Sequence, residues 1–183
     1  MEYLILGLLI LSPMTGYELQ QFIKKNLALI CSHSAGSVQT ALSKLVKEGK
    51  ATASEAAEGK RRKKTYSITA DGRAAFSHLV AQPMQAEKVK NMELSRLFFG
   101  GLAQPEARLA AVRDYIRQME ETRGLLSAIQ AHFQQMNRQD LPQGIDWRQV
   151  LRFQAYTIQY GIAAAEFEIN WYSRLLHELE EQP

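Results

Sequence analysis

Apolar side chains recur at helical spacing in the first part of the chain, in three segments separated by turn-forming residues. The first segment, residues 2–11, is followed by Ser12-Pro13, and proline disfavours helical geometry in the residue before it. Thr15 predicts the start of a second helix, residues 16–27, because Glu18 stands at its third position and completes a capping box. We expect this second helix to bury an apolar stripe made of Tyr17, Leu19, Phe22, Ile23 and Leu27.

A third helix is predicted over residues 35–48, with Ser32 or Ser34 as its N-cap and Gly49 just past its end. Its apolar positions fall on one side and are Val38, Ala41, Leu42 and Leu45. The other side is small, polar and cationic, and consists of Gly36, Ser37, Gln39, Thr40, Ser43, Lys44 and Lys47. This face carries no acidic residue before Glu48, so it can lie against a nucleic acid without charge repulsion.

The pattern becomes strand-like after the third helix. Residues 51–56 and 65–70 have strand-like content, and in the second segment Tyr66 and Ile68 alternate with polar residues. The predicted form is a β-hairpin. Its tip is expected to hold five consecutive cations, Lys60, Arg61, Arg62, Lys63 and Lys64. Asp71 then predicts the N-cap of a further helix, residues 72–80.

The rest of the chain has helical patterns alone. Gln82-Pro83 indicates a boundary, which divides the chain into domains at 1–82 and 83–183. A short helix is predicted over residues 92–99 and a long one over 105–136, where Pro105 suits the first turn. After a turn at 141–144, Asp146 predicts the cap of a last long helix, residues 147–180.

Both long helices carry apolar side chains every seven residues, the spacing of a seam between packed helices. The first helix has two such series. One is Val112, Met119, Leu126 and Phe133, and the other is Tyr115, Thr122, Ile129 and Met136. In the second helix they are Leu151, Ile158, Ala165, Tyr172, Leu179 and Gln154, Ile162, Ile169, Leu176. Each helix is roughly 45 Å long. One such pair leaves a long flank uncovered, so we expect a second copy to cover it in a homodimer.

Charge separates the two halves. Residues 1–80 hold 11 Lys and Arg against 6 Asp and Glu, whereas residues 81–183 hold 11 against 13. Only the first half is therefore expected to meet a polyanion. Cys31 is the only cysteine, which excludes a disulfide within the chain and favours the reducing cytoplasm. The apolar run at 3–11 is too short for a membrane span of roughly 20 residues, so no membrane association is expected.

Three helices followed by a hairpin are the order of a winged helix-turn-helix, whose third helix enters the major groove of DNA. This order gives the basic run a structural role as the tip of the wing, because clustered Lys and Arg bind phosphates with release of counterions. The competing interpretations are a disordered basic tail, a localisation signal or a merely solvated charge run. The predicted fold class is mainly α, with an N-terminal winged helix-turn-helix, a small β-hairpin wing and a C-terminal long-helix dimerisation domain.

Three stretches, TGYEL at 15–19, SAGSVQTALSKLVKEGK at 34–50 and GKRRKKTYSITADGRAAF at 59–76, resemble the PadR-like family of bacterial transcriptional regulators. RLFFGGL at 96–102 and the two long helices resemble the C-terminal domain of the family's longer, virulence-activator-like branch. The resemblance implies a dimer that binds an inverted-repeat operator in double-stranded DNA, with repression as the expected direction. It also implies a possible small-molecule effector.

One departure from the family concerns the first turn of the third helix. Family members typically carry a Tyr there, often followed by Pro, whereas this chain has Gln39 and Thr40. Gln can pair with adenine through two hydrogen bonds, so DNA binding is compatible with the change. The operator preference of relatives is not carried over to this chain.

The DNA-binding residues expected from the sequence are Ser37, Gln39, Thr40, Ser43, Lys44, Lys47, Lys60, Arg61, Arg62, Lys63, Lys64 and Tyr66, the last as a brace for the wing. Cys31 is interpreted as a small buried residue, with a redox switch as the alternative. His33 is either a phosphate contact or an ordinary surface residue. Tyr156 and Tyr160 lie off the seam and are the candidates for an effector pocket, although aromatic residues at helical spacing are more often core or interface.

Catalysis finds no support, because the four histidines are scattered and no HExxH, CxxC or phosphate-binding glycine loop occurs. No cofactor or metal is expected. Two alternatives to a DNA-binding regulator stay open at this point. One is a winged-helix protein-interaction module, and the other is a ligand sensor without specific DNA binding.

Overall fold

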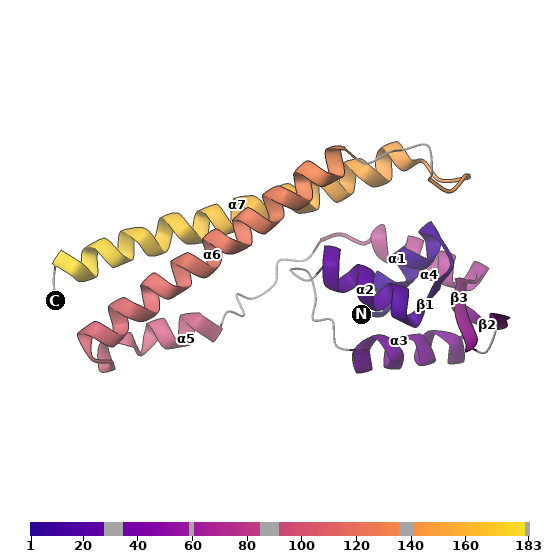
Figure 1. Ribbon diagram of the computed structural model, residues 1–183, viewed down its shortest axis with the longest axis horizontal. Coiled ribbons are helices and arrows are strands. Elements are labelled where there is room, and N and C mark those ends of the chain that lie inside the picture. Colours follow the sequence, from indigo (N-terminus) through magenta and orange to yellow (C-terminus); the bar gives the residue numbers. More distant parts are fainter. Residues whose placement is uncertain (28–34, 59–60, 85–91, 136–140, 182–183) are drawn as a thin grey trace. The chain divides into compact units, whose positions relative to one another are not determined.

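The computed structural model describes residues 1–27, 35–58, 61–84, 92–135 and 141–181. These residues form two compact units, each described here by itself. The first unit contains α1 (Glu2–Leu11), β1 (Met14–Thr15), α2 (Gly16–Asn26), α3 (Ala35–Lys47), β2 (Ala51–Glu58), β3 (Arg61–Ile68) and α4 (Ala70–Val80) (Figure 1). The second contains α5 (Met92–Phe98), a 3-10 turn η1 (Gly100–Leu102), α6 (Pro105–Gln134) and α7 (Trp147–Glu181). The predicted fold class is confirmed.

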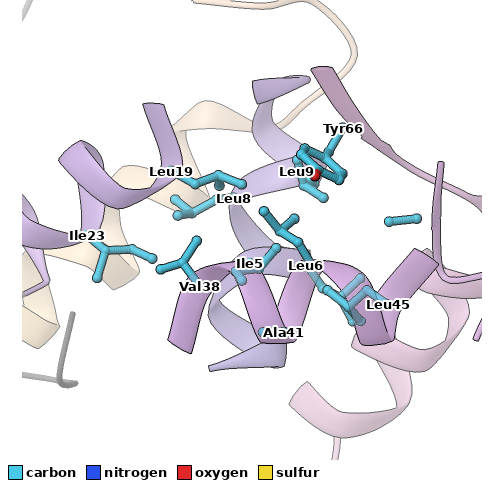
Figure 2. Close-up of a cluster of buried hydrophobic side chains, with 12 residues drawn as sticks. Ile5, Leu6, Leu8, Leu9, Leu19, Ile23, Val38, Ala41, Leu45 and Tyr66 are labelled. Atoms are coloured by element: carbon cyan, nitrogen blue, oxygen red, sulfur yellow. The ribbon is translucent and has the colours of Figure 1, made fainter. Parts of the chain in front are cut away.

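The first unit is organised around one apolar core to which α1, α2, α3 and the sheet all contribute (Figure 2). The side chains that are most deeply buried are Ile5, Leu6, Leu9, Leu19, Ile23, Val38, Leu42 and Leu45. The four apolar positions predicted for α3 are all among the buried residues. Tyr17 departs from the prediction, since 70% of it is exposed. The reason is helical geometry, because positions 17 and 19 are roughly 200° apart around the helix.

Helix starts follow the predicted capping chemistry at Thr15 but not at Asp71. The Thr15 Oγ1 accepts a hydrogen bond from the Glu18 backbone N–H (3.1 Å), and the Glu18 carboxylate accepts one from the Thr15 N–H (2.7 Å). In α4 the cap is Thr69, whose Oγ1 accepts from the Gly72 N–H at 3.0 Å. Gly72 has no room for a side chain, since a Cβ there would lie 2.0 Å from the Lys50 carbonyl oxygen.

The sheet has three antiparallel strands in the order β1-β3-β2. β1 is a strand of two residues that the sequence pattern did not indicate, and it pairs Met14 with Tyr66. β2 and β3 are longer than predicted, so residues 61–64 belong to the ladder itself rather than to the hairpin tip. The paired cations are compatible with strand geometry because β2 supplies small or acidic partners for them.

The second unit is built on the pairing of α6 with α7, which lie side by side along their length (Figure 1). The predicted heptad positions form the seam, where Val112, Leu126, Leu151, Ala165 and Tyr172 are buried. The helices approach closely at Gly161, where a Cβ would lie 3.0 Å from a Leu126 methyl carbon. The start of α7 is capped as predicted, with Asp146 Oδ1 accepting from the Gln149 N–H at 3.3 Å. None of the helices in the described ranges is long and apolar enough to cross a membrane.

Candidate nucleic-acid interface

The outward side of α3 is uncovered and polar. Gly36, Gln39, Thr40, Ser43 and Lys47 are exposed, and Ser37 is half-buried. The apolar side of the helix holds this face in place, because Val38, Leu42 and Leu45 lie in the core at 2% exposure or less. An amphipathic helix fixed in this way presents hydroxyl, amide and ammonium groups to the solvent, all of which can bond to phosphates or base edges.

Gln39, the residue that departs from the family pattern, lies beside the start of α2. A Cβ built on Gly16 would come within 3.7 Å of the Gln39 Oε1, 3.5 Å of a Leu42 methyl and 4.0 Å of the Tyr66 ring. Gly16 is therefore the point where α2, α3 and β3 meet. The exposed Gln39 amide stands at the edge of this junction, beside the start of α2.

Lys44 makes an ion pair within the unit. Its Nζ donates a hydrogen bond to Glu2 Oε1 at 2.8 Å and lies 3.9 Å from Glu48 Oε1. The hydrogen bond to Glu2, with the nearby negative charge, raises the pKa of the Lys44 ammonium. Lys44 therefore lies charged at the edge of the polar face of α3. A DNA phosphate has to compete with the Glu2 carboxylate for the Lys44 ammonium.

The hairpin of β2 and β3, here called the wing, lies next to α3 and contains most of the basic run. In its register Lys64 is opposite Glu55, and Arg61 is opposite Glu58. Lys63 and Lys64 are exposed, and the Lys64 Nζ lies 5.7 Å from the centre of the Tyr66 ring. The structure describes Arg61 and Arg62 by their backbone alone, and Lys60 falls outside the described residues.

Tyr66 is a core residue, with 4% of its surface exposed. The expectation that groups it with the DNA-facing side chains is wrong as far as direct contact is concerned, because a buried ring cannot reach a ligand. Its role as a brace fits the geometry. It packs in the core at the base of β3, and the stem of Lys64 runs toward its ring at cation–π distance.

A contact between Glu18 and Lys63 connects α2 to the wing. The Lys63 Nζ lies 3.8 Å from Glu18 Oε1. The same carboxylate accepts hydrogen bonds from the Thr15 backbone N–H and hydroxyl, and these bonds, with the charge of Lys63, hold its pKa below the ordinary value of 4.5. Glu18 therefore stays ionised at neutral pH and orients one wing cation toward the helix-turn-helix.

The acidic partners of the cations are the functional residues that the sequence argument missed. Glu2, Glu18 and Glu55 each lie beside or opposite a lysine that was assigned to DNA. The spacing of Lys44 and Glu48, four residues apart on a helix, was a usable signal. The positions of Glu2 and Glu18 relative to lysines that are 42 and 45 positions later depend on tertiary packing and carry no local signal.

Three further predictions concern other residues. Cys31 and His33 fall outside the described residues. Tyr156 and Tyr160, the candidates for an effector pocket, lie exposed on α7, where Arg152 Nε donates to the Tyr156 hydroxyl at 2.7 Å. Aromatic residues of the seam, Tyr115 and Tyr172, line a pocket in that unit instead. In the described ranges no group of three or more His, Cys, Asp or Glu is placed to hold a metal ion.

Comparison with known protein families gives two matches that together span most of the chain. The transcriptional regulator PadR-like family matches residues 5–78, and the virulence activator alpha C-terminal domain matches residues 89–180. The second match alone covers half of the chain. No curated protein sequence matches the chain.

Several solved structures share the fold over nearly the full length. Bacillus subtilis PadR in complex with operator DNA has a TM-score of 0.79 at 18% identity, covering 97% of this chain and 96% of that one. Bacillus subtilis PadR in complex with p-coumaric acid has a TM-score of 0.71 at 18% identity, covering 98% and 94%. The Streptococcus mutans protein smu.1604c has a TM-score of 0.73 at 26% identity, covering 99% and 96%.

Proposed function

Because the chain belongs to the PadR-like family of transcriptional regulators, we propose that it acts as a homodimer that binds an inverted-repeat operator in double-stranded DNA. The single observation that carries this proposal is the exposed polar face of α3 beside the cationic wing. In a winged helix, α3 enters the major groove and the wing contacts the flanking backbone. Repression is the proposed direction, since a dimer on an operator near a promoter blocks access to it. The same role places the protein in the cytoplasm and requires no catalysis.

In this proposal the contacts divide into two classes. Gln39, Thr40, Ser43 and Lys47 face the floor of the groove, where Gln pairs with adenine and Lys with guanine. Lys63 and Lys64, together with residues 60–62, neutralise phosphates and bind all sequences alike. Ser37 and Lys44 flank the helix and position it. The wing thus supplies affinity and α3 supplies specificity.

The dimer is supported by a stripe of exposed aromatic side chains on α7. Phe153, Tyr156, Tyr160 and Phe167 are 46–77% exposed. Their positions fall within roughly 60° of one another around the helix, on the side away from the seam residues Leu151 and Ala165. A contiguous apolar surface of this kind marks an interaction site. A second copy of the chain, packed along α7, covers it.

The relative that binds p-coumaric acid suggests that this chain also responds to a small-molecule effector. We include this response in the proposed function. The effector would shift the balance between a DNA-bound and a DNA-free form through its different affinity for the two.

The test is fluorescence anisotropy of the purified dimer with a duplex from upstream of its own gene, beside a scrambled duplex, at two salt concentrations. The native duplex is expected to bind more tightly, with a steep loss of affinity as salt rises. Equal affinity for both duplexes, or no binding by a folded dimer, would instead favour the protein-interaction module or the ligand sensor.

Variants separate the two classes of contact. Lys63→Ala with Lys64→Ala is expected to weaken binding to both duplexes and to reduce the salt slope by about two, one for each phosphate contact. Gln39→Ala is expected to reduce the preference for the native duplex and to leave the slope unchanged. The matched control is Lys24→Ala with Lys25→Ala, which removes the same charge from the end of α2. An equal loss in this control would mean that only net charge matters.

A further inference from the structure

Two lysines of α3, Lys44 and Lys47, differ in their surroundings. Lys47 is exposed and has no ion pair within the part of the chain that the structure describes. Lys44, one helical turn after Thr40, donates a hydrogen bond from its Nζ to Glu2 Oε1 at 2.8 Å. One lysine of the helix is therefore available to a polyanion, and the other is held by a carboxylate of α1.

The core of the first unit fixes the position of Glu2. Glu2 lies in the first turn of α1, where the helix dipole favours a carboxylate. Ile5 and Leu6 of the same helix pack in one cluster with Ala41 and Leu45 of α3 (Figure 2). The Glu2 side chain is 32% exposed and that of Lys44 is 54% exposed, so the carboxylate is the more enclosed member of the pair. The packing of α1 on α3 therefore keeps an acceptor beside the edge of the polar face.

A second carboxylate near Lys44 has another partner. The Lys44 Nζ is 3.9 Å from Glu48 Oε1, which is too long for a hydrogen bond, whereas Glu48 Oε2 accepts one from Lys50 Nζ at 2.7 Å. The hydrogen bond to Glu2 is also the first cause of the raised pKa of Lys44. Glu2 is thus the principal partner of Lys44.

The Glu2–Lys44 pair affects specific and non-specific DNA complexes differently. An exposed ion pair changes an equilibrium constant by at most about fivefold, so a phosphate that stays close to Lys44 can displace Glu2. Binding to arbitrary sequence depends on phosphate contacts alone and has no fixed register. In a specific complex the base contacts of α3 fix the register, and the same phosphate stays beside Lys44. Displacement of Glu2 is therefore harder in the non-specific complex.

We propose that Glu2 is a specificity-determining residue, which withholds Lys44 from the phosphates of arbitrary sequence and releases it to those of the operator. The inference rests on the proposed function, because it concerns the DNA contacts of α3. Specificity is a difference between two affinities, and it rises when the weaker complex loses a contact. Glu2 acts in this way without touching DNA itself.

The experiment uses the full-length protein and a double-mutant cycle of Glu2→Gln and Lys44→Gln. Fluorescence anisotropy at several salt concentrations gives the affinities for the native and the scrambled duplex. Glu2→Gln is expected to tighten binding to the scrambled duplex about two- to fivefold at low salt and to steepen its salt slope by about one. Binding to the native duplex is expected to tighten less than about twofold, with its slope unchanged, so the ratio of the two affinities falls.

The second variant of the cycle tests the same pair from the other side. Lys44→Gln alone is expected to weaken the native complex more than the scrambled one, because only the operator uses the lysine. In the Lys44→Gln background, Glu2→Gln is expected to leave the salt slope on the scrambled duplex unchanged, since the lysine that it releases is absent. A slope that still steepens there would overturn the proposal.

The matched control is Asp71→Asn, which removes one exposed carboxylate from the first turn of α4 and leaves the Glu2–Lys44 pair intact. Its salt slope is expected to equal that of the wild type. An equal gain in this control would reduce the effect to net charge and overturn the proposal.

A purely structural role of the pair predicts a different sign. If Glu2 only ties α1 to α3, its replacement lowers the free energy of unfolding in urea and leaves the affinities for both duplexes unchanged or weaker. That outcome would overturn the proposal. Equal tightening on both duplexes would overturn it as well, because specificity would then not depend on Glu2.

The same measurements separate this inference from the proposed function. A wild type that prefers the native duplex, together with unchanged binding in Glu2→Gln, would refute the role of Glu2 alone. A wild type without that preference would refute the specific regulator, and tighter binding by Glu2→Gln would then leave Glu2 as a restraint on non-specific binding only. Support for both requires the preference in the wild type and its decrease in Glu2→Gln.

Discussion

The two units of this protein bury their apolar side chains to very different degrees. Eight large side chains in the core of the first unit are at most 2% exposed. They come from α1, α2 and α3. In the second unit two helices of 30 and 35 residues share a seam in which the described buried residues are 4–8% exposed. The first unit completes its core within one chain, whereas the second leaves Phe153, Tyr160 and Phe167 more than half exposed on α7. The difference fits the proposed dimer, in which the first unit folds by itself and the second packs against a copy of itself.

The largest expected effect separates the two units physically. A fragment of residues 1–82 is expected to melt at a temperature that does not depend on concentration, because its core is self-contained. A fragment of residues 83–183 is expected to lose its fold on dilution, since the proposed dimer would be stabilised by mass action. Circular dichroism melting at two concentrations about tenfold apart measures both. A concentration-independent transition for residues 83–183 would contradict stabilisation of the second unit by dimerisation.

The exposed stripe of α7 provides the next test. Changing Phe153, Tyr160 and Phe167 together to Ser is expected to cost about 4 kcal/mol or more of dimerisation free energy, since each large apolar side chain buried contributes about 1.5–3 kcal/mol. The dimer dissociation constant would rise about a thousandfold. Analytical ultracentrifugation measures it. Tyr17→Ser, an equally exposed aromatic of the first unit, is the control and is expected to leave the dimer unchanged.

The core of the first unit is tested by Leu42→Ala, which is expected to lower its free energy of unfolding by about 3 kcal/mol through lost burial and a residual cavity. Both tryptophans, Trp147 and Trp171, lie in the second unit, so their fluorescence reports that unit alone. In urea, the far-UV circular dichroism of the first unit is expected to change at lower denaturant while the fluorescence transition stays in place. Coincident shifts of both signals would mean that the units unfold together.

The smallest effect concerns the capping box of α2, whose Glu18 also lies near Lys63 of the wing. Thr15→Ala is expected to cost about 1 kcal/mol of stability in the first unit. Glu18→Gln tests its pH dependence. Because the pKa of Glu18 is lowered in the folded protein, the stabilisation is present above its ordinary value of 4.5 and is lost as the pH falls through the folded value.

The urea stability of wild type and Glu18→Gln is therefore expected to differ at neutral pH and to converge in acid, below the lowered pKa of Glu18 in the folded protein. A difference that persists unchanged in acid would assign the effect of the variant to something other than the carboxylate charge. Ser54→Ala in β2 is a control outside the cap, and its difference from wild type is expected to show no such pH dependence.

Features with a local physical cause could be predicted from the sequence. The α1 boundary follows from Ser12-Pro13, the capping box from the spacing of Thr15 and Glu18, and the buried side of α3 from its periodicity. The heptad pattern indicated the α6–α7 seam for the same reason, since a packed helix pair imposes its period on the sequence.

Features that depend on contacts between distant segments could not be predicted from the sequence. β1 is two residues long and exists because Met14 meets Tyr66 across the sheet. The cap of α4 falls on Thr69 rather than Asp71, although both residue types are good caps, because the chain turns at the end of β3. The pairing of Lys44 with Glu2 and the pocket around Tyr172 likewise arise only when separate helices come together.

The register of the wing has a consequence for how the protein finds its operator. Lys64 is opposite Glu55 in the register, and the Lys63 Nζ lies 3.8 Å from Glu18 Oε1, so two wing cations have a carboxylate residue nearby. Each phosphate must displace such a neighbour, and the net gain from any one backbone contact is reduced. A regulator with lower affinity for non-specific DNA dissociates from it sooner. In the proposed function, these acidic residues would shorten each stop along the chromosome and speed the search for the sites that α3 binds specifically.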